Sequence, residues 1–131
     1  MQNASFLSLN TCDAADASAT ARAARWFWIF ATLHLLAWTL VPSLLFGNAP
    51  FDSVEGVSWG NLWLWGYQKH PPLAPWLSAF ATNWGGSIDW PLYLLSQLAV
   101  VTCFWATWRL ANKFMPPWQA LISVVLLEGI Y

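Results

Sequence analysis

Long apolar runs separated by short polar segments dominate the hydrophobic pattern of this chain. Residues 26–46 include no Asp, Glu, Lys or Arg, and about 20 apolar residues form a helix that crosses a bilayer. A second apolar run covers residues 91–109, with Asp89 as its N-cap and Pro91 in its first turn. A third run covers residues 117–131. The pattern predicts an all-α integral membrane protein with three transmembrane helices, the third of which is truncated.

The N-terminal segment has a different character. Residues 1–24 are rich in Ala, Ser, Thr and Asp, lack the period of a buried helix and do not open on the positive stretch of a secretory signal. They predict a loose cytoplasmic tail with a frayed helix near residues 13–24. Residues 25–131 are expected to form one membrane domain. Because the last apolar run has no cap and no polar flank, we expect the chain to be the N-terminal fragment of a longer protein.

Basic residues near the span ends predict the orientation in the membrane. Two precede the first span and two follow the second, and two crossings place all four on one side: Arg22, Arg25, Arg109 and Lys113. Because short cytoplasmic loops carry the excess of Lys and Arg, this side is expected to be cytoplasmic. The loop of residues 47–90 then lies outside, with Lys69 as its sole Lys or Arg.

The outer loop has the pattern of two interfacial helices. The first is expected to start near Asp52 and to end at Gly66. In the second, apolar residues recur at i, i+3, i+4 and i+7, which is the spacing of one helix face: Leu73, Trp76, Leu77 and Phe80. The segment YQKHPP joins the two helices, and NWGGS at residues 83–87 predicts a turn back into the bilayer.

Composition supports lipid rather than water as the solvent. Only 8% of the 131 residues are charged, against about 25% in soluble domains, and 58% are hydrophobic. A net charge of −1 without a basic stripe excludes a nucleic-acid partner. Cys12 and Cys103 fall in unrelated contexts, so neither a disulfide nor a metal site is predicted. For His34, near mid-membrane, a functional role is weighed against a neutral His bonded to a neighbouring helix, and the latter is favoured.

Two carboxylates in the outer loop are candidates for chemistry. Asp52 and Glu55 lie three residues apart on one face of the predicted helix, with Trp59 four residues further along it. A carboxylate placed at a hydroxyl can act as a general base. The segment DSVE also fits a capping box, in which Asp52 caps the helix and Glu55 reaches back to it. Capping is the commoner role for such a pair, and both interpretations stay open at this point.

A stiff basic pair follows in the same loop. Pro71 and Pro72 fix φ and favour an extended backbone at His70, so Lys69 and His70 are held on a rigid turn. A Lys at an interface commonly snorkels toward water or lipid phosphates, which needs no such rigidity. The turn therefore favours a site for an anionic phosphate beside a general base. A divalent cation could join the carboxylates and the phosphate, although the sequence spells out no set of metal ligands.

Together these features resemble the start of membrane glycosyltransferases of the GT-C type. The long first span, the early loop carboxylates, the motif GYxxHPPLxxWL at residues 66–77 and the further spans are most similar to the family-39 group. That group includes the protein O-mannosyltransferases and the lipid A aminoarabinose transferase. The resemblance covers residues 26–131, and its most specific pieces are the motif and the pair of Glu55 with Trp59.

The resemblance implies sugar transfer from a polyprenyl-phosphate-linked donor to a lipid or protein acceptor at the outer membrane face. Glu55 matches the second position of an acidic pair that acts as base or orients the acceptor, whereas Val54 stands at the first position. Asp52 lies close enough to substitute, so the resemblance leaves open which carboxylate is the base. His70 matches the position before Pro-Pro that binds the lipid phosphate, and Lys69 adds a second cation.

Further expectations follow from the same resemblance. Tyr67 and Trp59 are expected to bind substrate, and the protein is expected in a bacterial inner (plasma) membrane among its lipids. The N-terminus is then cytoplasmic and the 47–90 loop periplasmic or extracellular. The 131-residue piece alone is expected to be inactive, because the remaining spans should complete the groove for the lipid donor.

The competing interpretation is a non-enzymatic multi-span membrane protein, such as a transporter fragment or a scaffold. The outer loop would then be an interfacial anchor, since Trp is favoured at membrane interfaces and recurs there: Trp59, Trp63, Trp65, Trp76 and Trp84. Transporters concentrate polar groups at mid-membrane, where these spans offer only His34, Gln97 and the late Glu128. The polar residues gather in the outer loop instead, which favours chemistry at the interface.

Overall fold

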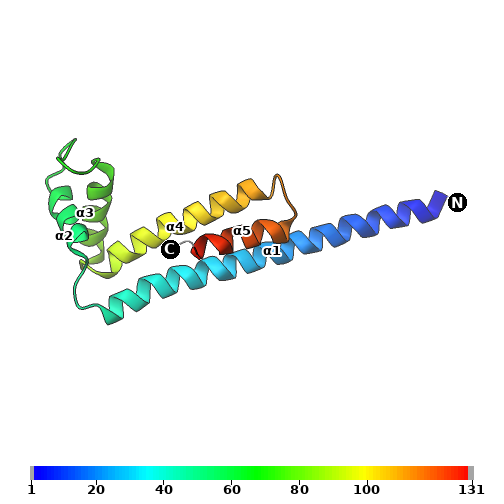
Figure 1. Ribbon diagram of the computed structural model, residues 1–131, viewed down its shortest axis with the longest axis horizontal. Coiled ribbons are helices and arrows are strands. Elements are labelled where there is room, and N and C mark those ends of the chain that lie inside the picture. Colours follow the sequence, from blue (N-terminus) through cyan, green and yellow to red (C-terminus); the bar gives the residue numbers. More distant parts are fainter. Residues whose placement is uncertain (1, 130–131) are drawn as a thin grey trace. The chain divides into compact units, whose positions relative to one another are not determined.

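A computed structural model describes residues 2–129 of the chain, with side chains from Asp16 onward. The described residues form helices and no strands, as the sequence predicts (Figure 1). The helices are α1 (Gln2–Leu45), α2 (Phe51–Gly60), α3 (Leu73–Gly85), α4 (Trp90–Ala111) and α5 (Pro117–Glu128). The chain divides into two compact units, one of Met1–Thr32 with Thr102–Tyr131 and one of Leu33–Val101.

Two helical segments are long and apolar enough to cross a membrane, namely Asp16–Leu45 within α1 and Trp90–Ala111. Only 17% and 11% of their most apolar stretches are buried within the protein, unlike the central helix of a soluble domain. The predicted third span coincides with α5, whose 12 residues extend about 18 Å, less than the thickness of a bilayer core. The last two residues of the predicted span, 130 and 131, lie outside the described residues. A third span therefore stays a prediction.

The N-terminal segment differs from the sequence prediction. Residues 2–24, expected to be a loose tail with a frayed helix only near residues 13–24, are regular helix continuous with the rest of α1. Alanine recurs throughout the segment, and alanine has the highest intrinsic helix propensity because it loses no side-chain entropy. The segment therefore extends a helix that the first apolar run already nucleates. Helix formation here needs no buried face, which is why the hydrophobic period did not reveal it.

Aromatic stacking joins α1 and α4 within the first unit. The ring of Phe27, which is fully buried, stacks on Trp108 with centroids 4.6 Å apart and planes 10° from parallel. One turn further along α1, Phe30 contacts Phe104 at 5.6 Å. The pairing runs forward in α1 and backward in α4, so the two helices are antiparallel here, as two successive crossings require.

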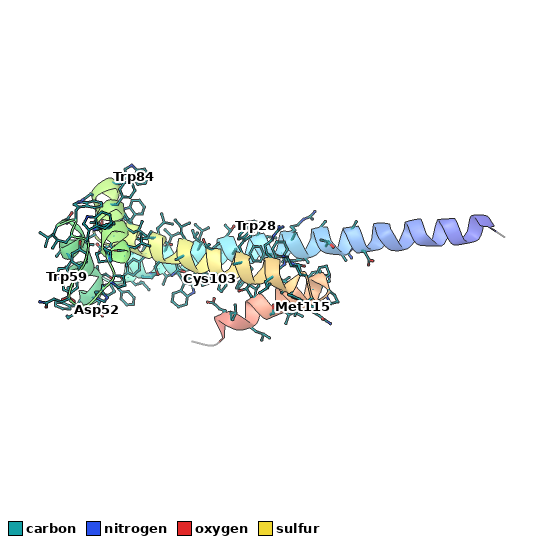
Figure 2. The ribbon with its side chains drawn as sticks, turned by 90° about the horizontal axis from the view of Figure 1, so that it is seen from above. Trp28, Asp52, Trp59, Trp84, Cys103 and Met115 are labelled. Atoms are coloured by element: carbon teal, nitrogen blue, oxygen red, sulfur yellow. The ribbon has the colours of Figure 1, made fainter. Side chains whose placement is uncertain are left out.

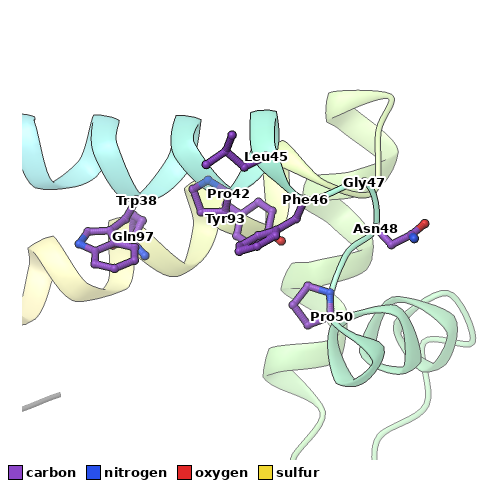
Figure 3. A pocket seen from close by; sticks show the side chains of 9 residues that line it. All are labelled: Trp38, Pro42, Leu45, Phe46, Gly47, Asn48, Pro50, Tyr93 and Gln97. Atoms are coloured by element: carbon purple, nitrogen blue, oxygen red, sulfur yellow. The ribbon is translucent and has the colours of Figure 1, made fainter.

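In the second unit a polar contact joins the same two helices. His34 Nε2 and Gln97 Oε1 share a hydrogen bond of 2.8 Å, which confirms the interpretation of His34 as a His bonded to a neighbouring helix. Near it lies an open pocket of about 600 Å³, lined by residues that include Trp38, Tyr93 and Gln97 (Figure 3). None of the predicted site residues lines this pocket.

The two short helices between α1 and α4, α2 and α3, form a tight hairpin. A Cβ added at Gly60 would collide with the carbonyl of Pro75 and would lie 2.7 Å from Ala79 Cβ, so only glycine permits this approach of α2 and α3. Asn83 Nδ2 donates a hydrogen bond of 3.0 Å to Asn61 Oδ1 and ties the same helices beyond this contact. The hairpin is the packed frame on which residues 61–72 are held.

The ends of the hairpin helices correct one prediction and confirm another. The first helix ends at Gly60 rather than Gly66, because a turn follows in which the Trp63 N–H donates to Gly60 O and Trp63 has a left-handed φ of 50°. The second helix ends where NWGGS predicts a turn. Gly86 there has a φ of 66°, and its N–H donates to the Thr82 carbonyl, the usual left-handed termination.

We predict that Gly60→Ala opens the hairpin, because overpacking of this kind costs about 1–3 kcal/mol. Gly56→Ala is the matched control: it lies in the same helix, and a Cβ there meets nothing within 4 Å. Hydrogen exchange of residues 51–85 in detergent should accelerate in Gly60→Ala and stay unchanged or slow in Gly56→Ala. Equal exchange in the two variants would contradict close packing at Gly60.

Candidate functional site

Five of the six predicted site residues form one cluster, in which three side chains contact the indole of Trp59 and a fourth is paired with one of these three. The Tyr67 ring stacks on the Trp59 indole at 5.8 Å with planes 7° apart, and the His70 ring lies at 5.6 Å and 50°. The Lys69 ammonium lies 5.7 Å from the indole centroid, within the range of a cation–π contact. We call this group the Trp59 cluster, and its members are Glu55, Trp59, Tyr67, Lys69 and His70.

Helix spacing and one loop hydrogen bond build the cluster. Glu55 and Trp59 lie four residues apart on α2 and therefore share one face of it. Beyond α2 the chain returns over that face, where the Leu64 N–H donates a hydrogen bond of 3.1 Å to the Tyr67 hydroxyl. Pro72 then caps α3. The loop thus brings Lys69 back to a residue 14 positions earlier in the chain.

An ion pair joins the acidic and basic candidates. Lys69 Nζ donates to Glu55 Oε1 at 3.0 Å and to Oε2 at 3.3 Å. The Lys69 side chain is 63% exposed and that of Glu55 only 20%. A pair this open to solvent stabilises a fold by about 1 kcal/mol at most, because water screens the charges. The ion pair matters to the site because it holds the mostly buried carboxylate of Glu55 beside the accessible ammonium of Lys69.

The capping-box interpretation is wrong. Pro50 is the N-cap of α2 and makes no side-chain cap hydrogen bond, while Asp52 lies inside the first turn. The N–H groups of Ser53 and Val54 donate to the Pro50 carbonyl. A box needs the carboxylate of Glu55 to reach back toward the cap, and here it faces forward to Lys69. Because Pro50 starts the helix two residues earlier than DSVE suggests, neither acid has a capping role.

Asp52 is the one predicted site residue outside the cluster. It lies one turn before Glu55 and is exposed, and its carboxylate has no hydrogen bond or ion pair among the described residues (Figure 2). Its charge suits the first turn of a helix, where the backbone N–H dipoles favour an anion. The structure therefore separates the two acids that the sequence left equivalent.

Next to the cluster lies an open pocket of about 250 Å³ with aromatic walls. Trp59 and Tyr67 line it together with the loop residues Leu62, Leu64, Gly66 and Gln68. Flat rings of this kind can hold the apolar face of a ring or chain. Within residues 16–129 no three His, Cys, Asp or Glu side chains gather as metal ligands. In the cluster only Glu55 and His70 belong to the common ligand types.

Sequence reasoning missed the supports of the site. Leu64 enters through its backbone N–H, and Asn61 through a partner 22 residues away. Trp76 was expected on the membrane-facing side of its helix and within the motif of residues 66–77, and its ring in addition contacts Trp65 at 5.2 Å and Trp63 at 6.0 Å. A hydrogen bond from a backbone N–H cannot be predicted from the identity of the side chain, because nearly every residue carries this donor. A contact across the hairpin could have been found only by docking the two predicted helices.

One family model matches part of the chain. The family is described as dolichyl-phosphate-mannose-protein mannosyltransferase, and the match covers residues 69–131. Lys69, His70, Pro71 and Pro72 fall inside the matched segment, whereas Glu55, Trp59 and Tyr67 precede it. No curated protein and no solved structure matches the chain. The comparison thus supports a membrane glycosyltransferase in general terms. The matched segment does not include Glu55, the one acidic residue of the cluster.

We predict that Trp59→Leu frees the returning loop, because three ring or cation contacts of the cluster meet at this indole. Ring contacts of this kind are worth about 0.5–1.5 kcal/mol each, so hydrogen exchange of residues 64–70 should rise several-fold. Trp84→Leu is the control, since Trp84 is 80% exposed on α3. A similar rise in both variants would show that Trp59 does not organise the loop.

Proposed function

We propose that this protein transfers a sugar from a polyprenyl-phosphate-linked donor to a hydroxyl of a lipid or protein acceptor at the outer face of a membrane. The observation that carries the proposal is the Glu55–Lys69 pair beside His70 on the Trp59 indole. The matched family supports the reaction class, since its description names a phosphate-linked mannose donor and a protein acceptor. Two helices are long and apolar enough to cross a membrane, and a polyprenyl-linked donor also resides in a membrane.

Lys69 and His70 are proposed to receive the donor phosphate. Lys69 is accessible from solvent, so a phosphate can approach its ammonium without disturbing the hairpin. The ring of His70 lies on the same indole and offers a second N–H donor to a phosphate oxygen. Positive charge and N–H donors at this point would stabilise the leaving lipid phosphate as its charge develops.

Glu55 is proposed as the general base. In the resting site its two oxygens accept from Lys69. An arriving phosphate competes for the same ammonium, and the pair is weak enough to yield, which leaves the carboxylate free to accept a proton. The acceptor oxygen then bonds to the anomeric carbon, its proton passes to Glu55, and the bond from that carbon to the phosphate oxygen breaks. Polyprenyl phosphate leaves with the electron pair.

The aromatic residues of the cluster are proposed to hold the sugar. Trp59 and Tyr67 present parallel rings beside an open pocket, and a pyranose can lay its C–H face on such a ring. Asp52 has no proposed part in the proton transfer because it lies outside the cluster. It stands one helical turn from Glu55, where a charge still acts on an incoming acceptor.

The anchor interpretation has one observation in its favour. Several loop tryptophans are exposed, among them Trp65 at 86% and Trp84 at 80%, as expected of rings placed in a lipid interface. An anchor needs exposed rings but neither a shielded carboxylate nor a cation paired to it. The two proposals therefore differ in what they demand of Glu55, and substitutions there separate them.

We predict that Glu55→Gln lowers turnover about 10²- to 10⁴-fold in the intact protein, because the amide has no basic oxygen to accept the proton. Asp52→Asn, the matched neutralisation one turn away, should retain most of the wild-type rate. The measurement is transfer from polyprenyl-phosphate mannose to acceptor in proteoliposomes. If Asp52→Asn loses the activity and Glu55→Gln keeps it, Asp52 is the base. If both variants are fully active, the catalytic proposal fails and the anchor interpretation remains.

A charge swap separates structure from chemistry. Glu55→Lys combined with Lys69→Glu keeps an ion pair across the same two positions but moves the carboxylate to the loop. We predict wild-type hydrogen exchange in the loop and no recovery of transfer. Lys69→Arg, which keeps the cation in place, should chiefly raise KM for the donor because the planar guanidinium fits the point-charge site less well. Recovery of transfer in the swapped protein would mean that the pair is only structural.

A further inference from the structure

The unit that contains the end of α4 holds a further hollow, far along the sequence from the Trp59 cluster. It is an open pocket of about 350 Å³, and its lining comes from three segments: Thr20 on α1, Trp108, Arg109, Asn112 and Lys113 at and beyond the end of α4, and Pro117 at the start of α5. We call it the Arg109 pocket. None of its residues takes part in the proposed transfer.

Two cations of the pocket have no anionic partner. Arg109 contacts the Trp105 ring at 5.9 Å, and neither Arg109 nor Lys113 forms an ion pair with any described residue. Both side chains are exposed. Among the described acidic residues of this unit, Asp16 is exposed one turn before Thr20, and Glu128 lies at the opposite end of α5 from Pro117. The pocket lining thus has two positive charges and no negative one, which favours binding of an anion.

Two of the lining residues, Trp108 and Asn112, also carry N–H groups of the kind that bind phosphate oxygens. The Trp108 Nε1–H is buried and has no acceptor in the described protein, which costs about 1–3 kcal/mol unless a ligand supplies one. The Thr20 hydroxyl donates to the Asp16 carbonyl and Asn112 Nδ2 donates to the Trp108 carbonyl. These bonds fix Thr20 and Asn112 at the rim and leave the second N–H of the Asn112 amide available.

Its surroundings point to a lipid rather than a soluble anion. The pocket lies where a membrane-length helix ends, and the loop that follows exposes Phe114 at 80% and Met115 at 37% (Figure 2 labels Met115). Trp118, at the start of α5, is 40% exposed. Apolar and aromatic side chains beside unpaired Lys and Arg at a span end are the composition that meets lipid headgroups.

We propose that the Arg109 pocket binds the phosphate of an anionic phospholipid headgroup. Arg109 and Lys113 neutralise the phosphate, while the exposed side chains of Phe114, Met115 and Trp118 lie against the acyl chains. The site is independent of the proposed transfer reaction, since it uses other residues and another class of ligand. It would fix the depth of this end of α4 in a leaflet that contains anionic lipid.

Titration of the intact protein in detergent with phosphatidylglycerol and with phosphatidylcholine, followed by native mass spectrometry, tests the proposal. Each cation near a charged lipid surface is worth about a 5-fold change in affinity, so Arg109→Gln with Lys113→Gln should weaken phosphatidylglycerol binding about 30-fold. The matched control is Arg22→Gln with Arg25→Gln, which removes the same charge from residues of α1 that do not line the pocket. This control should change the affinity by less than about 3-fold.

Two further comparisons test whether the bound phosphate belongs to a lipid or to a soluble anion, and whether it binds in the Arg109 pocket. Inorganic phosphate at about 10 mM, in a buffer of about 0.15 M ionic strength, should not displace phosphatidylglycerol, because it lacks acyl chains to meet the apolar rim. Displacement would overturn the lipid assignment in favour of a soluble phosphate. Equal binding of the two lipids, or equal losses in the two double variants, would overturn the pocket itself. Unchanged helix content by circular dichroism checks that the variants fold.

Discussion

The contact of Gly60 with Pro75 is the constraint on which the segment between α1 and α4 depends. Because glycine has no Cβ, the backbones of α2 and α3 approach until Gly60 meets the Pro75 carbonyl, and the twelve-residue connection has to fold back over α2. That return brings Lys69 to Glu55. A larger residue at position 60 would part the helices and with them the two charges. The candidate chemistry therefore rests on a residue that carries no chemistry of its own.

One polar pair lies between the membrane-length helices, whereas the cations near a helix end and in the loop are accessible. His34 and Gln97 satisfy each other between α1 and α4, because an unpaired polar group in lipid is costly. Lys69 is paired but 63% exposed, and Arg109 and Lys113 carry no ion pair among the described residues. An accessible charge retains its capacity to bind a ligand. Both proposed binding sites involve phosphate, and each has its cations near a helix end or in a loop.

The Glu55–Lys69 pair illustrates how an ion pair of little stabilising value can matter to function. A strong, buried pair would hold its partners permanently, and neither would be available to a substrate. A solvent-screened pair holds them in position and yields to a competing anion. Because the proposed donor brings such an anion, its binding and the release of the base become one event. In the proposed reaction, glycosyl transfer would begin only once the donor phosphate has bound.

The sequence by itself determined the all-α architecture, the two membrane-length helices and the members of the candidate site, because these depend on local composition and on helix spacing. Glu55 and Trp59 had to share a face once α2 formed, and Pro71 with Pro72 had to stiffen the turn after Lys69 and His70. The sequence misjudged the N-terminal segment, whose alanines form helix without an apolar period, and the end of α2, since nothing local shows that Gly60 is needed against Pro75.

Only the tertiary structure showed that Asp52 and Glu55 have different surroundings, because the difference depends on a cation 14 residues beyond Glu55 and on where Pro50 starts the helix. It likewise decided that His34 pairs with Gln97 and that Thr20 joins Arg109 and Lys113 around one pocket. Each of these is a contact between segments distant in sequence. The hydrophobic periodicity of a sequence shows which residues share one face of a helix. Tertiary packing decides which of these faces contacts which neighbouring helix.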